Sequence, residues 1–398
     1  MRFSEFQSFP REAKNLIIYY TISSPLLITW TVFPIYLFML GFNVENVGIL
    51  YTVSSFFAAL ATAVIGRLLD KRITARNAII LLECFGMVSN FVFSKAETAS
   101  DIILGETIER ASLTFSVAFQ VYEKDAYPED IREKVYAYHM ALPHIATIIS
   151  YLIIGILLTY VFTSIVAYRF LYFVAGLFSI LIVLYVYKFL PNISNKISFK
   201  EKSKKAKIPR RLLPIAIGEI LIVLGFIFAP EFILANYIYN ILGFSVLYFV
   251  LLSVISGIIS VIASEIASRG SKKLRFAMIY GGIFLMIVYS FAIYMLQYLT
   301  ITPIAKLLII FAVTIILEFG HTFYFIYERA YLLDNIPNEI RGTILGLISS
   351  TTRIVAIIAP AIAGIIAYRI GALTPFLAQT FFLSSGIIAF WISSKIMD

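Results

Sequence analysis

The sequence predicts an all-α membrane protein with twelve transmembrane helices arranged as two bundles of six. Of its 398 residues, 60% are apolar and 14% are charged, and the mean hydropathy is +0.91. Soluble domains carry about 25% charged residues, so this composition excludes a soluble fold. A helix that crosses the bilayer needs roughly 20 apolar residues, and the apolar residues of this chain suffice for about twelve such helices.

The apolar runs fall into two groups of six, separated by charged and turn residues. The first group has expected helices at about 15 to 40, 46 to 69, 76 to 94, 102 to 122, 134 to 161 and 164 to 188. The second group has expected helices at about 212 to 240, 244 to 267, 275 to 298, 302 to 327, 343 to 367 and 371 to 395. The first run is too long for a signal-peptide core. We therefore expect an N-terminal six-helix bundle over 1–190, a basic linker over 191–211 and a C-terminal six-helix bundle over 212–398.

The positions of lysine and arginine predict the orientation, because these residues are retained on the cytoplasmic side during insertion. With twelve spans, both termini and the linker lie on the same face. We count 26 of the 32 cations on that face, four on the other face and two inside spans. The sequence therefore predicts a multi-pass protein of the cell membrane whose termini and central loop are cytoplasmic. The same count explains the net charge of +9 without a nucleic-acid partner.

The two halves carry an internal repeat. Leu40-Gly41-Phe42 closes the first expected span and Leu242-Gly243-Phe244 closes the seventh. The segments 125–132 and 334–341, which follow the fourth and tenth spans, share Asp, Pro, Ile and Arg at a constant offset of 209. Parallel repeats of this kind are typical of transporters that bind their solute near the middle of the membrane.

The loop between spans two and three resembles the signature of the major facilitator superfamily. That signature runs Gly-x-Leu-Ala-Asp-Arg-x-Gly-Arg-Lys, and this chain has Gly66, Leu68 and Asp70 at matching positions, with Lys71 keeping the positive charge. The second glycine and the last two basic residues of the signature are absent. The resemblance implies a solute carrier with alternating access. It also implies that Asp70 holds the cytoplasmic side shut against the start of span eleven, which follows Arg341.

Charged residues inside the spans are the main candidates for function, because each costs a few kcal/mol unless it faces a partner or a water-filled cavity. Glu106 and Arg110 are four residues apart in span four, so we expect them to pair. Glu109 is left over, and the offset of 209 places it opposite Glu318, with His321 one helical turn later. A carboxyl group in a low-dielectric cavity binds a proton more readily than one in water. We therefore expect Glu109 and Glu318 to be proton or cation sites.

The remaining intramembrane charges leave several interpretations open. Arg353 has no acid within four residues, so its partner is Glu318 on another helix or an anionic solute held together with Arg110. Alternatively Glu106, Glu109, Arg110 and Arg353 form a static ion-pair cluster. Three acids without a local cation, Glu83, Glu219 and Glu231, are either neutral when buried or face a cavity, and Glu231 follows the helix-breaking Pro230. Of the two histidines of span five, we expect His139 at the membrane interface near the cytoplasmic helix end, and His144, one residue after Pro143, deeper and as a candidate for a role in transport.

The excess of acids over arginines inside the spans favours protons or cations over anions as ligands. The leading hypothesis is a secondary transporter, a proton-coupled exporter or antiporter of a small, lipophilic molecule. The alternatives are a proton-coupled symporter that imports a nutrient or organic anion, an integral-membrane enzyme and a non-transporting receptor. We expect a monomer in contact with membrane lipids, with no enzymatic activity, no cofactor and no metal site. A single cysteine, Cys84, excludes an intramolecular disulfide.

Overall fold

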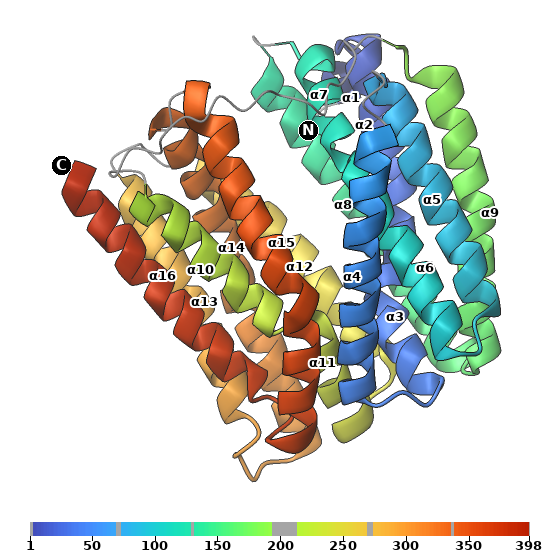
Figure 1. Ribbon diagram of the computed structural model, residues 1–398, viewed down its shortest axis with the longest axis vertical. Coiled ribbons are helices and arrows are strands. Elements are labelled where there is room, and N and C mark those ends of the chain that lie inside the picture. The colour runs from blue at the N-terminus through green and yellow to red at the C-terminus, as the bar shows by residue number, and fades with distance from the viewer. Residues whose placement is uncertain are drawn as a thin grey trace. The chain divides into compact units, whose positions relative to one another are not determined.

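The computed structural model describes residues 3–68, 73–128, 131–192, 213–268, 274–335 and 338–397. All elements in this part of the chain are helical (Figure 1). The first half contains α1 (Phe3–Gln7), α2 (Arg11–Ser23), η1 (Ser24–Leu27), α3 (Ile28–Met39), α4 (Val44–Leu68), α5 (Ala75–Lys95), α6 (Ala99–Ser112), η2 (Leu113–Ser116), α7 (Val117–Ala126), α8 (Arg132–Ile156), η3 (Leu157–Val161) and α9 (Ile165–Phe189). The second half contains α10 (Leu213–Phe228), α11 (Glu231–Asn236), η5 (Tyr237–Ile241), α12 (Val246–Ser268), α13 (Arg275–Met295), α14 (Pro303–Asn335), α15 (Asn338–Arg369) and α16 (Pro375–Met397).

The chain forms two compact units. Met1–Leu40 and Val53–Glu201 make up the first unit, and Gly41–Thr52 and Lys202–Asp398 make up the second. The first turns of α4 thus pack with the second unit, where the guanidinium of Arg369 in α15 donates a hydrogen bond of 2.8 Å to Glu45. The division of the chain into bundles at residues 190 and 212 stays a prediction.

Ten helices or helix runs in the described part are long and apolar enough to cross a membrane. The fourth and eleventh expected spans are not among them, for different reasons. The fourth consists of α6, η2 and α7, and α6 alone carries Asp101, Glu106, Glu109 and Arg110. In α15, which runs over 32 residues, the apolar stretch among those whose side chains the structure describes is Ile354–Arg369. A span rich in charge needs interior surroundings for its polar groups, which makes the fourth a candidate for function.

The helices of the first unit break at the same polar region. A 3₁₀ segment, η1, with Pro25 in its first turn, separates α2 from α3. Another 3₁₀ segment, η2, separates α6 from α7, and α8 contains Pro143. The hydroxyl of Ser24 in η1 donates a hydrogen bond of 3.0 Å to the carbonyl of Pro143. Short 3₁₀ stretches within a longer helix often mark functional hinges, and these breaks expose serine side chains and backbone groups inside the unit.

Aromatic packing holds the first unit together. The α5 helix lies beside α9, and α2 packs against α8 (Figure 1). The core between them is rich in large side chains, of which Tyr122, Phe115 and Leu16 are almost fully buried. Two further buried tyrosines donate hydrogen bonds to the backbone. The Tyr36 hydroxyl donates to the carbonyl of Phe93, and the Tyr172 hydroxyl donates to the carbonyl of Thr29. Tyrosine suits such positions because its ring is apolar and its hydroxyl still finds a partner.

The second unit depends on a close approach of α13 and α14, which lie side by side (Figure 1). A methyl group added at Gly282 would lie 2.6 Å from the carbonyl oxygen of Gly320, and one added at Gly320 would lie 2.6 Å from that of Gly282. Both distances are too short for any side chain. Small residues at such crossings allow helix backbones to pack closely inside membranes.

Two glycines support the internal repeat that the sequence predicts. Gly41 has a φ of 91° and Gly243 a φ of 74°, and they are the positive-φ residues of the described chain. Each follows the end of its helix, at Leu40 and Leu242, where a left-handed residue closes the last turn and glycine adopts it without strain. The two matching Leu-Gly-Phe segments therefore have the same backbone role.

Candidate functional site

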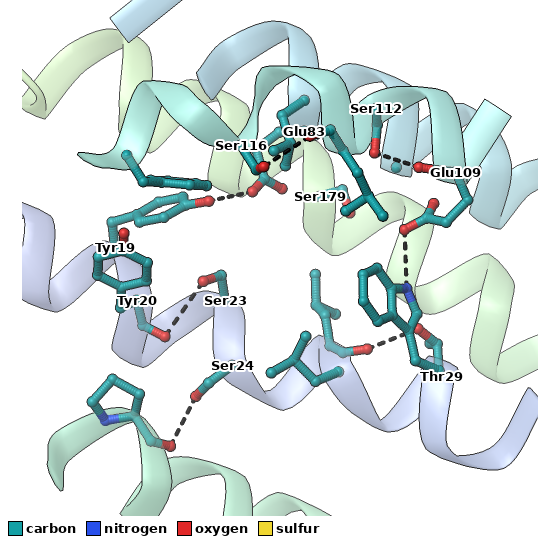
Figure 2. Close-up of a pocket in the computed structure, with 18 of the residues that line it drawn as sticks. Tyr19, Tyr20, Ser23, Ser24, Thr29, Glu83, Glu109, Ser112, Ser116 and Ser179 are labelled. Atoms are coloured by element: carbon teal, nitrogen blue, oxygen red, sulfur yellow. Dashed lines mark hydrogen bonds between the residues drawn. The ribbon is translucent and has the colours of Figure 1, made fainter. Parts of the chain in front are cut away.

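The first unit encloses a cavity of about 380 Å³ at the helix breaks. Two carboxyl groups face it, Glu83 from α5 and Glu109 from α6 (Figure 2). Its walls combine aromatic rings with the serine hydroxyls of the broken helices. Among the described residues that line it there is no lysine or arginine. Two histidines of α8, His139 and His144, also line it. The cavity is thus acidic, aromatic and lacking a fixed cation in its described lining.

Glu83 is held by the hydroxyl of Tyr19, which donates a hydrogen bond to Oε1 (Figure 2). Tyr19 is 2% exposed and comes from α2, 64 residues earlier in the chain. The ring of Tyr19 packs on Phe119 with centroids 5.7 Å apart and touches Tyr20 at 5.3 Å. A carboxyl group in such apolar surroundings is stable when it shares a proton, donates a hydrogen bond or faces a cation.

Glu109 is held by Trp30 of α3, whose indole N–H donates a hydrogen bond of 2.9 Å to Oε1. The other carboxylate oxygen, Oε2, is buried and forms no hydrogen bond in the described part of the chain. The hydroxyl of Ser89, also buried without a formed hydrogen bond, lies near enough to interact with this carboxyl group. Gly86 leaves room beside Oε2, since an added methyl group there would stand 3.8 Å from it. The Oε2 atom is therefore the part of the site with unused bonding capacity.

The pair that the sequence predicts in α6 is present. Arg110 Nε donates to Glu106 Oε2 at 2.5 Å, one helical turn apart. Glu106 is buried, at 7% exposure, and neither residue belongs to the lining of the cavity. A buried carboxylate is stabilised by such a partner, and whether the pair also takes part in transport stays a prediction.

A second polar cluster lies beside the cavity and includes two of its lining residues, Tyr20 and His139. The Tyr20 hydroxyl donates a hydrogen bond of 2.7 Å to Glu123 Oε1, and the Tyr20 ring stacks on His139 at a centroid distance of 4.1 Å. His139 Nδ1 lies 2.9 Å from the Tyr127 hydroxyl and 3.8 Å from Glu123 Oε1. Sequence reasoning places His139 at a helix end; in the structure its ring also forms part of the cavity wall.

The three candidate acids of the second unit lie on three helices. Glu219 of α10 accepts a hydrogen bond of 2.8 Å from the Tyr324 hydroxyl of α14. Glu231 begins α11 directly after the break at Pro230, where the sequence predicts a bend. Tyr289 of α13 is close enough to Glu231 and Glu318 to interact electrostatically with both. Glu318 also lies near the Ser256 hydroxyl of α12, and the ring of its neighbour His321 contacts Phe226 at 5.9 Å.

Several predicted residues fall on parts of the chain that the structure does not describe. Asp70 and Lys71 lie outside the described residues. Gly66 and Leu68 belong to the end of α4, and Arg341 and Arg353 belong to α15, but their side chains are not among those described. The latch at Asp70 and the partner of Arg353 therefore stay predictions.

Comparison with known proteins decides the family. Residues 15–360 match the family model of the Major Facilitator Superfamily. The chain belongs to this superfamily. The resemblance that the signature loop indicates is thereby confirmed, and with it a multi-pass membrane protein of the major facilitator fold. No curated protein sequence matches the chain.

Solved structures of transporters have the same fold. A bacterial homologue of the iron transporter ferroportin, in an inward-facing state, aligns with a TM-score of 0.75 and 13% identity over 99% of this chain and 100% of its own. A bacterial metal transporter aligns with a TM-score of 0.70 and 12% identity over 98% of this chain and 100% of its own. The nucleoside transporter NupG aligns with a TM-score of 0.63 and 15% identity over 97% and 99%. Each of these structures is of a transporter or a transporter homologue, and at such identities they show the fold alone.

In this major facilitator protein, sequence reasoning missed the partners of the candidate acids. Trp30 and Glu109 are 79 residues apart, and Tyr19 and Glu83 are 64 apart, so no local spacing connects them. The sequence does not decide whether Glu83 is a neutral buried acid or faces a cavity. The structure places Glu83 in the cavity wall. The sequence signal that could have located the cavity is the set of serines beside prolines and at helix breaks, because these serines line the cavity.

Proposed function

We propose that this major facilitator protein is a proton-coupled secondary transporter that exports a small solute by alternating access, and that Glu109, together with Glu83, is its coupling site. The observation that carries this proposal is the shared cavity of the two acids, whose described lining has no lysine or arginine. The two carboxyl groups are near enough to interact electrostatically. Two neighbouring carboxylates in a poorly solvated space do not both ionise easily, so binding and release of a proton are expected there.

The second cluster supports a route for that proton. Tyr20 and His139 line the cavity, and both contact Glu123 of α7, the helix whose C-terminal end the cation distribution predicts to be cytoplasmic. Imidazole and carboxyl groups within hydrogen-bonding reach of tyrosine hydroxyls are typical members of proton relays in transporters. We propose that they exchange protons between the cavity and the cytoplasm.

Glu318 is proposed as the counterpart of Glu109 in the second half. Its surroundings resemble those of Glu109 in chemistry, with a serine hydroxyl, an aromatic residue and a second acid nearby. The repeat offset of 209 relates the two positions. Equivalent acids in parallel repeats give a carrier one titratable group in each half.

The experiment that tests this proposal is solute accumulation in inverted membrane vesicles with an imposed proton gradient. With the vesicle interior acidic, we expect a substrate from a panel of small solutes to accumulate inside, and a protonophore to abolish the accumulation. Accumulation that ignores the gradient would overturn proton coupling. Accumulation only with the opposite gradient would overturn export in favour of symport.

A further inference from the structure

The chemistry of the cavity in the first unit limits what it binds. Its volume of about 380 Å³ lies at the lower end of the range of small-molecule sites. An anion would meet two carboxyl groups and no lysine or arginine in the described lining. A neutral polar solute would leave the charges of both acids uncompensated when they ionise. The lining therefore favours a cation.

The walls favour an organic cation over a metal ion. No group of three or more His, Cys, Asp or Glu side chains that could hold a metal occurs among the described residues. Hard divalent cations need six or more oxygen ligands, whereas Glu83 and Glu109 each already accept a hydrogen bond from an aromatic residue. Aromatic side chains instead pack favourably against the ring of an aromatic cation.

The rings and acids are arranged along the cavity. Tyr20 and Phe119 form one wall, with ring centroids 5.3 Å apart. Tyr19 and Glu83 lie next to this wall, and Glu109 lies across the cavity from Tyr19 and Tyr20 (Figure 2). Trp30 borders the carboxyl group of Glu109, whose buried Oε2 forms no hydrogen bond in the described part of the chain. A ligand in this cavity therefore meets aromatic rings beside Glu83 and a second carboxyl group, that of Glu109, across from them.

We propose that this cavity, formed by the first unit alone, binds a small aromatic ammonium ion. The ammonium group lies between Glu83 and Glu109, where it donates a hydrogen bond to Oε2 of Glu109, and the aromatic ring packs on Tyr20 and Phe119. When Glu109 carries a proton, binding releases it: the protonated carboxyl group and the cation give the carboxylate–cation pair and one free proton. The proposal rests on the proposed function and gives it a substrate class, because exchange of a cation for a proton at one carboxylate couples the two in opposite directions.

The charged and titratable groups around the two acids come from several helices, and all of them bear on the pH dependence of binding. They are Glu106 and Arg110 of α6, Tyr19 and Tyr20 of α2, and His139 and His144 of α8. Arg110 is engaged with Glu106, so it does not replace the cation. We expect binding to weaken as the pH falls, because protons compete for the carboxylates and the histidines become positively charged.

Trp30 provides the test. The chain has two tryptophans, Trp30 and Trp391, so the variant Trp391→Phe leaves a single tryptophan, in the cavity wall, whose emission can be excited selectively. This protein, in lipid nanodiscs without any proton gradient, is titrated with 2-phenylethylammonium, with the neutral 2-phenylethanol and with the anionic 3-phenylpropionate. Binding is also measured by calorimetry, which detects the ligand even if the tryptophan emission does not change. We expect saturable binding of the ammonium ion, with affinity at least about tenfold above that of the alcohol.

Variants separate the proposed site from other modes of binding. Glu109→Gln and Glu83→Gln should each lower the affinity for the ammonium ion about tenfold. The matched control Glu97→Gln removes a carboxylate that is 72% exposed and lies outside the cavity lining, and it should change nothing. Gly86→Ala adds a methyl group 3.8 Å from Oε2 of Glu109 and should also weaken binding. This variant tests the site if the glutamine variants do not fold.

Three outcomes would overturn the proposal: no binding by either method, equal binding of the alcohol, or affinity that the cavity variants leave unchanged. These outcomes concern equilibrium binding without a gradient. They are therefore distinct from failure of the proposed function, which would appear as gradient-independent transport of a solute.

Discussion

Trp30 and Glu109 are joined by a hydrogen bond of 2.9 Å from the indole N–H to Oε1, across 79 residues of sequence. Trp30 follows the 3₁₀ break η1, and Glu109 precedes the 3₁₀ break η2. The bond thus connects the two interrupted helices of the first unit at the cavity. It fixes one oxygen of the carboxyl group and leaves the other available.

Trp30→Phe tests the importance of this bond. The substitution keeps an aromatic ring and removes the donor, so Glu109 loses its orientation. A hydrogen bond to a charged group contributes about 1.5–3 kcal/mol when buried. Because Trp30 is 49% exposed, we expect the lower end, a fall in proton-driven transport of about tenfold. Trp391→Phe in α16 is the matched control, and an equal loss in that variant would contradict a specific role for Trp30.

Glu106→Gln separates structure from coupling in α6. Removing the carboxylate that pairs with Arg110 should lower the free energy of unfolding by about 1–3 kcal/mol, less than for a fully buried pair because Arg110 is 33% exposed. Thermal unfolding in detergent measures this loss, and gradient-driven accumulation in vesicles should persist. If instead stability is unchanged and coupling disappears, Glu106 belongs to the coupling site.

Gly282→Ala tests the close crossing of α13 and α14. The added methyl group would meet the Gly320 carbonyl at 2.6 Å, and overpacking of this kind costs about 1–3 kcal/mol. Gly281→Ala on the same helix is the matched control, since nothing lies within 4 Å of its added methyl group. We expect a lower Tm for Gly282→Ala only. Equal Tm values for the two variants would show that the helices do not approach as closely as described.

Asp101→Asn tests the cap at the start of α6. The backbone N–H groups of Glu97 and Thr98 and the hydroxyl of Thr98 donate to Asp101, and these bonds lower the pKa of its carboxyl group. A lowered pKa stabilises the folded state above the usual carboxyl range, and this stabilisation is lost as the pH falls through the folded-state value. The Tm of the wild type should therefore exceed that of Asp101→Asn at neutral pH, and the gap should close in acid. A gap that does not depend on pH would contradict the cap.

Much of the fold follows from the sequence because it depends on local patterns. Apolar runs of the required length predict most of the helices, and the Leu-Gly-Phe repeats predict Gly41 and Gly243 as equivalent positions. The spacing of Glu106 and Arg110 likewise predicts their pair. The fourth span was predicted as one helix, and the structure divides it at η2. Hydropathy does not register such a break, because a 3₁₀ turn needs no change in composition.

The cavity depends on contacts between distant segments, so only its acids were accessible from the sequence. The partners Tyr19 and Trp30 come from helices far from Glu83 and Glu109, and helix rotation decides whether they meet. No sequence pattern distinguishes Trp30 from the other aromatic residues. The rings of this chain are too numerous, at 16% of residues, for composition to single it out.

Glu109→Gln tests the central claim most directly. In proteoliposomes, solute counterflow without a gradient is measured beside accumulation driven by a proton gradient, for the wild type, Glu109→Gln and the control Glu97→Gln. The account predicts that Glu109→Gln abolishes the gradient-driven accumulation and retains measurable counterflow, while Glu97→Gln behaves as the wild type. Gradient-driven accumulation by Glu109→Gln at the wild-type level would contradict it.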